Sequence, residues 1–302
     1  MPFRVRTVVC VLLLAITGDA IAAGARREPT FVSTGWLSGH LRDANLVVLH
    51  ASNQRADFDA GHVPGARFIG WTSIVVPRDS LSSELPAEAR FDSLLEAAGV
   101  RDDSRLVITG GPVTVMSRLF VTLEHFGLGD RTSMLNGGID AWREEGRTVS
   151  RDSTLAAKGD VTLRPAPERV VDAEWIAAHG KGVSPGVAVV DARTPEYFQG
   201  LASNSNPRSG RLPVAGNVPY TWLTEELGRF RDRDDMEKLF SRAGVKRGDH
   251  VVTYCHIGIQ ACVAYVAARS LGYEVSMYDG SFEDWSKRSA LPVESGPADP
   301  PR

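Results

Sequence analysis

Short apolar runs alternate along the chain with segments whose apolar residues recur at helical spacing. The stretch VVTYCHIGIQACVAYVAARSLGYEV, residues 251–275, contains both patterns in succession. It starts with β-branched residues, which predict a short buried strand, and continues as an Ala-rich stretch with helical periodicity. The same alternation elsewhere predicts an α/β fold, in which mostly parallel sheets are flanked by helices.

The pattern occurs twice, in the same order, in the two halves of the chain. Residues 91–111 resemble residues 236–256, and the later sequence MLNGGIDAW resembles MYDGSFEDW. Two earlier pairs of segments also match, LVVLHAS with VAVVDAR and GHVPGARFI with GRLPVAGNVP. We therefore predict a duplicated domain, with one copy at residues 31–149, a polar linker at 150–167 and a second copy at 168–294.

The first 23 residues follow a different pattern. Arg4 and Arg6 precede an apolar run at residues 7–16, and an Ala-Ile-Ala sequence ending at Ala22 has the small residues typical of a cleavage site. These features predict a signal peptide at residues 1–23, with an ordinary N-terminal core helix as the alternative. The apolar run is too short to span a bilayer. We expect an exported, periplasmic protein that does not contact the membrane after cleavage.

The composition is that of a globular protein of about two domains. The 302 residues are 43% hydrophobic and 24% charged, and the formal net charge of -3 gives no indication of nucleic-acid binding. No cluster of cysteine and histidine residues has the spacing of a metal site. We therefore expect neither a nucleic acid nor a metal among the ligands. Nothing in the sequence fixes the oligomeric state.

Three cysteines are present, and cleavage of the signal peptide removes Cys10. Cys262 lies among core-type positions of the predicted helix, so we expect it to pack as a small hydrophobic residue. A disulfide between the remaining two is disfavoured, because one lies at the start of a loop and the other inside a helix. Cys255 is left as an exposed free thiol between strand and helix, which is unusual in an exported protein.

The position of Cys255 favours a role as a nucleophile. A helix N-terminus presents unpaired backbone N–H groups and the positive end of the helix dipole, which stabilise a thiolate. Gly258 can adopt the positive φ of a tight loop around an anion, and Ile257 and Ile259 add no polar side chain that competes with the backbone. The alternative is a buried structural cysteine. The first copy of the loop argues against it, because Gly110 stands at the equivalent position.

Three kinds of cysteine enzyme differ in the neighbours that they require. A phosphatase of the C-x5-R type needs an arginine six residues after the cysteine, where Ala261 stands. A thioredoxin-like site needs a second cysteine at the position of Gly258. A Cys–His hydrolase needs a general base near the thiol, and the adjacent His256 is either a solvated loop residue or a substrate contact.

The sequence VVTYCHIGIQA, preceded by VVDARTPEYF and followed by LGYEVSMYDGSFEDW, resembles the rhodanese-type sulfurtransferases. The likeness is to tandem-domain members with an inactive first domain and an active second one, and it covers roughly residues 31–291. It implies that Cys255 takes sulfane sulfur from thiosulfate or 3-mercaptopyruvate and passes it, as a persulfide, to cyanide or a thiol. It implies no cofactor. A rhodanese-like sulfur carrier or binding module without turnover is the alternative.

The resemblance also assigns a role to the loop after the cysteine. Its backbone amides would surround the persulfide, and the residues concerned are His256, Ile257, Gly258, Ile259, Gln260 and Ala261. Thiosulfate-preferring members often carry cationic side chains in this loop, and mercaptopyruvate-preferring members carry small neutral ones. The present side chains fit neither pattern, so the preferred donor stays open.

Two arginines are candidate ligands for the anionic donor. Arg193 follows Asp191 in a family-like Asp-x-Arg sequence, and it either binds the donor or forms an ion pair that shapes the loop. Arg211 stands where the family often has histidine, and it either adds positive charge near the site or solvates a surface turn. Ser52 stands opposite Arg193 in the first copy, which agrees with a silent first domain.

Further support for the site is expected from a neighbouring loop and helix start, at Asp279, Gly280, Ser281 and Trp285. Trp142 is the equivalent of Trp285 in the first copy, which favours a packing role for both residues. The long polar loop at residues 199–210 either covers the site or is mobile.

Overall fold

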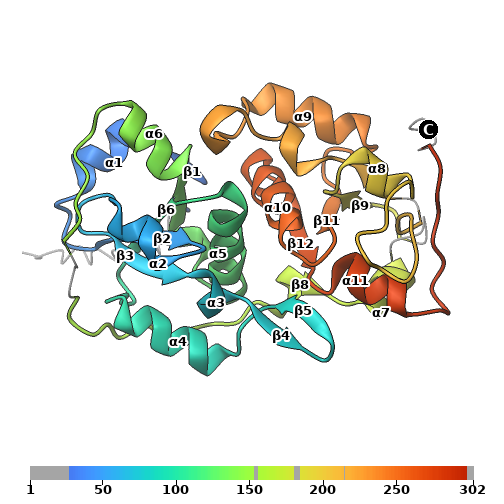
Figure 1. Cartoon of the computed structure of the whole chain (residues 1–302), viewed down its shortest axis with the longest axis horizontal. Helices are drawn as coiled ribbons and strands as arrows, with labels where there is room; N and C mark the ends of the chain where they lie inside the picture. Colours follow the sequence, from blue (N-terminus) through green and yellow to red (C-terminus); the bar gives the residue numbers. More distant parts are fainter. Residues whose placement is uncertain (1–26, 153–155, 180–183, 214, 298–302) are drawn as a thin grey trace, which may run out of the picture.

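The computed structural model describes residues 27–152, 156–179, 184–213 and 215–297 (Figure 1). The predicted signal peptide at residues 1–23 and Cys10 lie outside these residues. Each half of the chain contains one five-stranded parallel sheet accompanied by helices. The predicted α/β fold with two tandem domains is thereby confirmed.

The first sheet has the strand order β1-β7-β6-β2-β3, and every neighbouring pair is parallel. Its strands are β1 (Phe31–Val32), β2 (Leu46–Ser52), β3 (Arg67–Gly70), β6 (Arg105–Gly110) and β7 (Thr132–Leu135). The helices of this half are α1 (Thr34–His40), α2 (Arg55–Asp59), α3 (Trp71–Ile74), α4 (Glu88–Ala97), α5 (Val113–His125), η1 (Gly129–Arg131) and α6 (Gly138–Glu144). An antiparallel hairpin of β4 (Val76–Arg78) and β5 (Leu81–Glu84) follows α3.

The second sheet has the order β10-β9-β11-β12-β8, which is the order of the first sheet read from the other edge. Its strands are β8 (Val170–Val171), β9 (Val187–Asp191), β10 (Gly216–Asn217), β11 (His250–Tyr254) and β12 (Glu274–Tyr278). The helices are η2 (Pro167–Arg169), α7 (Ala173–His179), α8 (Pro195–Phe198), η3 (Tyr220–Trp222), η4 (Glu226–Gly228), α9 (Arg233–Arg242), α10 (Gln260–Leu271) and α11 (Ser281–Lys287). The matching topology confirms the duplication.

Strand β11 is the central strand of the second sheet. It is hydrogen-bonded to β9 on one side and to β12 on the other, and all but the first of its residues are buried. Burial on both faces explains its continuous apolar run. In an open parallel sheet, ligands bind beyond the carboxyl ends of the strands, and β11 delivers Cys255 to this edge.

The two halves pack against each other through α5 and α10, which lie side by side at the centre of the molecule (Figure 1). Residues 261–269 of α10 are all buried, because this helix lies between its own sheet and α5. Alanine at positions 264, 267 and 268 permits such close packing on several sides. One hydrophobic core therefore extends across both halves, and Cys262 is buried in it, as expected.

The predicted linker packs along the first domain. The backbone N–H of Gly159 donates to the carbonyl oxygen of Glu96 at 2.7 Å, and that of Ala166 donates to His125 at 2.7 Å. Val161, between these two points, is buried in the shared core. Backbone hydrogen bonds therefore fix residues 159–166 of the linker against the first domain.

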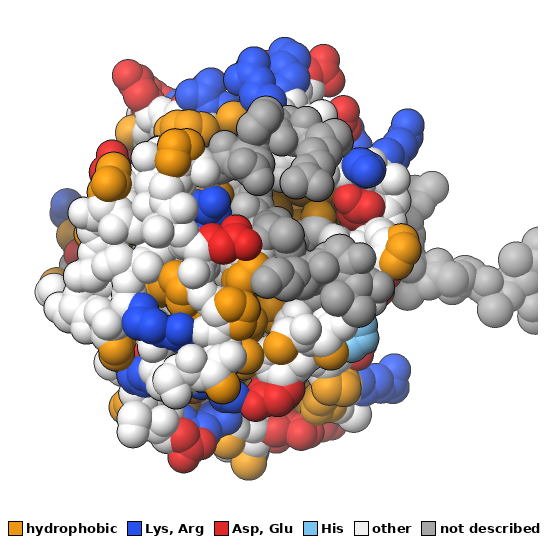
Figure 2. Space-filling view, turned by 90° about the vertical axis from the view of Figure 1, so that its right-hand side faces the viewer, with side chains coloured by type: hydrophobic (Ala, Val, Ile, Leu, Met, Phe, Trp, Pro, Cys, Tyr) orange, Lys and Arg blue, Asp and Glu red, His pale blue; other side chains and the backbone are white. Residues whose placement is uncertain are grey.

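On the face seen in Figure 2, basic and acidic side chains both occur, with a group of Lys and Arg side chains at the upper edge. The formal net charge is -3. Within residues 27–297, apart from the short gaps in the description, no helix is long and apolar enough to cross a membrane. In the same residues, no three His, Cys, Asp or Glu side chains are grouped to hold a metal ion.

Trp142 and Trp285 occupy equivalent core positions in the two halves. Each side chain is 2% exposed. The Nε1 of Trp142 donates to the carbonyl oxygen of Thr148 at 2.9 Å, and that of Trp285 donates to Pro292 at 2.8 Å. Both residues therefore have the packing role that their equivalence predicts.

Replacing either tryptophan should destabilise the protein strongly. We expect Trp142→Ala and Trp285→Ala each to lower the free energy of unfolding by about 3–5 kcal/mol, because each leaves a cavity and an unpaired carbonyl oxygen. Urea denaturation followed by circular dichroism measures the change. Trp222, which is 48% exposed, is the control, and Trp222→Ala should change stability by only about 0.5 kcal/mol. Equal losses in all three variants would contradict the packing role.

Candidate active site

Cys255 lies directly after β11, and the loop that it opens leads to the start of α10 at Gln260. Its side chain is fully buried, so the expectation of an exposed thiol is wrong. The cause is tertiary: β11 is central in its sheet, and the first domain packs over the carboxyl end of this strand. Cys255 is one of the residues that line a cavity between the two domains.

A row of unpaired backbone donors follows the cysteine. In the part of the chain that the structure describes, nothing accepts a hydrogen bond from the six N–H groups of residues 256–261. Buried backbone N–H groups are nearly always paired in proteins. Successive unpaired N–H groups in a turn that leads into a helix form an anion-binding concavity. This geometry is the one expected from the sequence for a thiolate or a persulfide.

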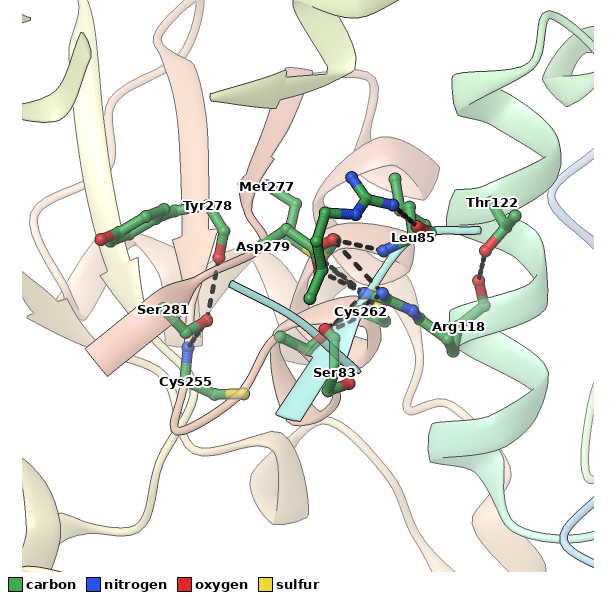
Figure 3. Close-up of polar contacts among 12 residues, drawn as sticks. Ser83, Leu85, Arg118, Thr122, Cys255, Cys262, Met277, Tyr278, Asp279 and Ser281 are labelled. Carbon is green, nitrogen blue, oxygen red and sulfur yellow. Dashed lines mark hydrogen bonds and ion pairs between the residues drawn. The ribbon is translucent and has the colours of Figure 1, made fainter. Parts of the chain in front are cut away.

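The carbonyl oxygens of the same loop are occupied from outside. Cys255 accepts from the backbone N–H of Phe282 at 3.0 Å, and His256 accepts from that of Glu283 at 2.9 Å. The N–H of Cys255 donates to Oγ of Ser281 at 3.1 Å, and Ser281 donates to the carbonyl oxygen of Tyr278 at 2.9 Å (Figure 3). The start of α11 thus holds the loop by its outer side and leaves the inner donors free.

Gly258 has the positive φ expected of it, at +79°. A Cβ atom at this position would lie 2.7 Å from both the carbonyl oxygen and Oδ1 of Asp279. Such a contact is shorter than any real Cβ contact, and both atoms belong to a fixed segment. The loop can therefore turn here only with glycine.

Asp279 is fixed by a buried arginine from the other domain. Nη1 of Arg118, in α5, lies 2.5 Å from Oδ1 of Asp279, and Nη2 lies 3.3 Å from Oδ2 (Figure 3). Nη1 also donates to the carbonyl oxygen of Gly258 at 3.4 Å. The backbone N–H of Leu85, just after β5, donates to Oδ2 of Asp279 at 2.8 Å. Two segments of the first domain therefore converge on the loop that supports Cys255.

Arg118 carries its charge although its side chain is fully buried. Burial lowers the pKa of the Arg118 guanidinium, but Asp279 raises it above its usual value. Arg118 is not among the residues expected from the sequence. The sequence feature that could have drawn attention to it is an arginine within the otherwise apolar helical stretch VTVMSRLFV. This feature indicates a buried charge, but it does not identify the partner of that charge.

The structure places Arg193 in the ion pair, the second of its two expected roles. Nε of Arg193 donates to both carboxylate oxygens of Asp191 at 2.9 and 3.1 Å, and Nη2 donates to the carbonyl oxygen of Gly210 at 2.7 Å. Its guanidinium also lies 4.3 Å from the centre of the Phe282 ring. Arg193 does not line the cavity, because Asp191, two residues before it, holds the side chain.

Arg211 is also away from the cavity, and it does not solvate a surface turn. The side chain is 6% exposed, and its guanidinium lies 4.5 Å from the centre of the Phe198 ring. It donates to the carbonyl oxygens of Gly296 at 2.8 Å and of Pro297 at 3.4 Å. The assignment of Arg211 to substrate binding is corrected by these contacts, which attach the C-terminal segment to the domain.

His256 is buried, so the interpretation as a solvated loop residue is wrong. Its ring packs edge-on against Tyr197, with the centroids 4.4 Å apart. Burial, and next the charge of Arg193, lower the pKa of His256 to about 4. The imidazole is therefore neutral near pH 7 and too weakly basic to be an efficient general base.

The cavity at Cys255 has a volume of about 410 Å³ and receives side chains from both domains. Trp71 and Thr114 come from the first domain, and Tyr220 comes from the second, together with residues of the cysteine loop. Asn204 also lines it, so the polar loop at 199–210 reaches the site. A larger cavity of about 750 Å³, between α8 and α9, contains no cysteine.

The equivalent loop of the first domain cannot hold a cysteine. Gly110 stands opposite Cys255 and has a φ of +125°. A Cβ atom there would lie 2.1 Å from the carbonyl oxygen of Ala51. Any side chain at this position would therefore collide with β2, which agrees with a silent first domain.

A family model described as the rhodanese-like domain matches the chain twice, at residues 33–145 and 173–288. The chain belongs to the rhodanese family. The thiosulfate sulfurtransferase of Corynebacterium glutamicum is 31% identical over 281 residues, covering 88% of this chain and 90% of that protein. Sulfur carrier protein TtuD of Thermus thermophilus is 26% identical over 292 residues, covering 90% of this chain and 99% of that protein.

The fold of this rhodanese-family protein is also that of SseA from Escherichia coli, whose structure is described as that of a 3-mercaptopyruvate sulfotransferase. The two structures superpose with a TM-score of 0.73 and 25% sequence identity, covering 84% of this chain and 99% of that one. The resemblance that the sequence analysis draws on is thus confirmed. The chain is a sulfurtransferase with two rhodanese domains.

A methyl group at Gly258 should disable the site without unfolding the protein. We expect Gly258→Ala to reduce sulfur transfer at least about 100-fold, because the loop must shift away from Asp279 and its N–H groups then lose their alignment. The left-handed φ alone costs about 1–3 kcal/mol. Steady-state kinetics and a thermal melt measure the two effects.

Gly272 provides a matched control for this variant. It has a φ of +93° at the end of α10, and a Cβ atom there would meet nothing within 4 Å. Gly272→Ala therefore carries a comparable backbone strain without a collision. If both variants lose activity equally, the loop geometry at Gly258 is not the cause.

Proposed function

We propose that this protein transfers sulfane sulfur from a small anionic donor to cyanide or a thiol through a persulfide on Cys255. The Cys255 thiolate attacks the outer sulfur of thiosulfate, the S–S bond of the donor breaks, and sulfite leaves with the electron pair. The acceptor then attacks the outer sulfur of the persulfide, and Cys255 leaves as a thiolate. With cyanide as the acceptor, the product is thiocyanate.

The observation that carries this proposal is the row of unpaired N–H groups at residues 256–261. A persulfide places a negative charge about 2 Å beyond the cysteine sulfur, where preorganised backbone donors can stabilise it. Arg193 is charged as well, but the ion pair with Asp191 balances its charge. Burial lowers the pKa of Arg193, whereas Asp191 and, less strongly, Tyr254 and Cys255 raise it above its usual value, so the guanidinium stays charged.

Thiosulfate is the donor that we place first, and 3-mercaptopyruvate is the second. Thiosulfate appears in the name of the relative from Corynebacterium glutamicum, which is 31% identical. 3-Mercaptopyruvate appears in the description of the Escherichia coli structure, at 25% identity. With either donor, binding of the anion would depend on the backbone of the loop, because the described residues that line the cavity include no Lys or Arg.

A sulfur carrier without rapid turnover is the second candidate. It is supported by the likeness to the protein named as a sulfur carrier in Thermus thermophilus. The burial of Cys255 also favours it, because a buried persulfide is protected from solvent thiols. A carrier would load one sulfur atom per chain and release it only slowly to small acceptors.

We also propose that the mature protein is exported to a periplasm. Arg4 and Arg6 before a short apolar run, and the small residues near Ala22 and Ala23, support a cleaved signal peptide. Sequencing the N-terminus of the protein purified from its native cells would test this.

Replacing Cys255 should abolish the reaction. We expect Cys255→Ser to lower the rate of thiocyanate formation at least about 1,000-fold, because an alkoxide is not available near pH 7 and no persulfide can form. The wild-type protein and the variant are assayed in parallel with thiosulfate and 3-mercaptopyruvate, and the ratio of the two rates assigns the donor.

Cys262 offers the control for this experiment. Burial raises the pKa of its thiol to about 12, so Cys262→Ala should still gain the mass of one sulfur atom on exposure to the donor. Loading without turnover would favour the carrier. The absence of both loading and turnover in folded, reduced wild-type protein would refute sulfur transfer from these donors.

A further inference from the structure

The cavity at Cys255 is electrically neutral. Among the residues that the structure describes, no Lys, Arg, Asp or Glu side chain lines it. His256, the one titratable side chain in the lining besides Tyr220 and Cys255, is neutral near pH 7 because burial and then Arg193 lower its pKa to about 4. A charged group in the body of a ligand, beyond the reach of the N–H groups of residues 256–261, would therefore meet no opposite charge in the lining.

The cavity is also larger than a small inorganic donor requires. Its volume of about 410 Å³ lies within the range of about 300–1,000 Å³ typical of sites for organic ligands. Trp71, Tyr220 and Ile257 contribute apolar surface to it. An organic molecule of modest size would fill the space that thiosulfate leaves.

Two polar side-chain atoms in this lining have no hydrogen-bond partner among the described residues. They are Oε1 of Gln260 and Nδ1 of His256. An amide oxygen can only accept a hydrogen bond, and leaving it buried and unpaired costs about 1–3 kcal/mol. A ligand that brings an N–H or O–H group would satisfy it.

We propose that the physiological sulfur acceptor is an uncharged organic thiol whose body carries an amide, hydroxyl or ring N–H group. This inference rests on the proposed function and specifies its second substrate. The body of the acceptor lies in the neutral cavity, and its donor group pairs with Gln260. Charge is confined to the reacting sulfur, beside the N–H groups of residues 256–261.

The transfer step is balanced without a further reactant. The acceptor thiol loses its proton to solvent, and its sulfur attacks the outer sulfur of the Cys255 persulfide. A new S–S bond forms, the bond to Cys255 breaks, and Cys255 leaves as a thiolate. The acceptor departs as a persulfide.

A pair of isosteric thiols tests the proposal. Protein loaded with sulfur from thiosulfate is mixed with 3-mercaptopropanamide or 3-mercaptopropanoate, and single-turnover rates are measured. Each rate is divided by the rate at which the same thiol reacts with a small-molecule persulfide. We expect the normalised rate of the amide to be at least about 10-fold higher than that of the carboxylate. Gln260→Leu should reduce this ratio, and Thr114→Lys should reverse it. Because the rates of the two thiols are compared within the same protein preparation, their ratio does not depend on the fraction of a variant that is active.

Equal rates for the two thiols, or a faster carboxylate, would overturn the proposal. Failure to load sulfur from either donor would contradict the proposed function instead. In that case calorimetric titration of the unloaded protein with both thiols still decides the matter, because the neutral cavity should bind the amide more tightly than the carboxylate.

A second inference follows from the contacts of Arg118 and does not depend on the cavity. Its guanidinium holds Asp279 by two nitrogens and reaches the carbonyl oxygen of Gly258. Asp279 in turn lies next to Gly258, which belongs to the loop of unpaired donors: a Cβ atom at Gly258 would be 2.7 Å from Oδ1 of Asp279. We infer that Arg118 is a positioning residue, through which the silent domain fixes the alignment of the N–H groups around the persulfide.

The same interface contains a matched ion pair that does not reach the loop. Nε of Arg269 lies 2.6 Å from Oε2 of Glu124, and both side chains are buried. Arg269 lies near the C-terminal end of α10, whereas the cysteine loop precedes the N-terminal end. Loss of Arg118 leaves the buried Asp279 carboxylate without a cation, and loss of Arg269 leaves buried Glu124 only Arg27, at 3.9 Å, so both losses should destabilise the interface.

The experiment compares Arg118→Met with Arg269→Met at a temperature at which both remain folded. We expect Arg118→Met to lower kcat for transfer to cyanide at least about 10-fold and Arg269→Met to change it by no more than about 2-fold. Arg118→Lys should recover part of the loss, and it replaces the methionine variant if that one does not fold. Combining Arg118→Met with Asp279→Asn should cost little more than either change alone, because both break one contact. Equal kinetic losses in the two methionine variants, or losses that multiply in the double variant, would refute the positioning role.

Discussion

The contacts around Cys255 hold the N–H groups of residues 256–261 in a row without hydrogen-bond partners among the described residues. Such a row is unfavourable by itself, because each unpaired donor costs free energy that a hydrogen bond would recover. It persists because the loop is held by its carbonyl oxygens, from Phe282, Glu283 and Arg118, and by the N–H of Cys255 itself. An anion bound at the centre of the loop would accept the hydrogen bonds that these N–H groups do not form within the protein.

Both halves of the duplicated scaffold contribute residues to the site. The first domain has the same sheet order but a glycine in contact with β2 where the second has its cysteine. It retains an indirect part, since it supplies Arg118, the segment at Leu85 and one side of the cavity. The first domain, which has no cysteine in this loop, thus contributes structurally to the site of the second domain.

The features that follow from local patterns could be predicted from the sequence. Alternating apolar runs and helical periods predict the α/β fold, the order of matched segments predicts the duplication, and a cysteine before a helix start with Gly258 in the loop predicts the anion site. The burial of Cys255, His256 and Arg211 could not be read in this way, because it results from the packing of the first domain and of the C-terminal segment. Arg118 and Asp279 are 161 residues apart, and no local pattern identifies such a pair.

In the sulfur transfer that we propose, the cavity at Cys255 also determines the order of events. Displacement at sulfur is collinear, so the leaving group of the donor lies on the extension of the new bond from Cys255, on the cavity side. The acceptor must later approach the outer sulfur along this same line. The two molecules therefore need one place at different times, and the remnant of the donor has to depart before the acceptor arrives. For the proposed reaction, a donor and an acceptor that share this cavity imply a double-displacement (ping-pong) sequence, in which the loaded protein exists free of both substrates.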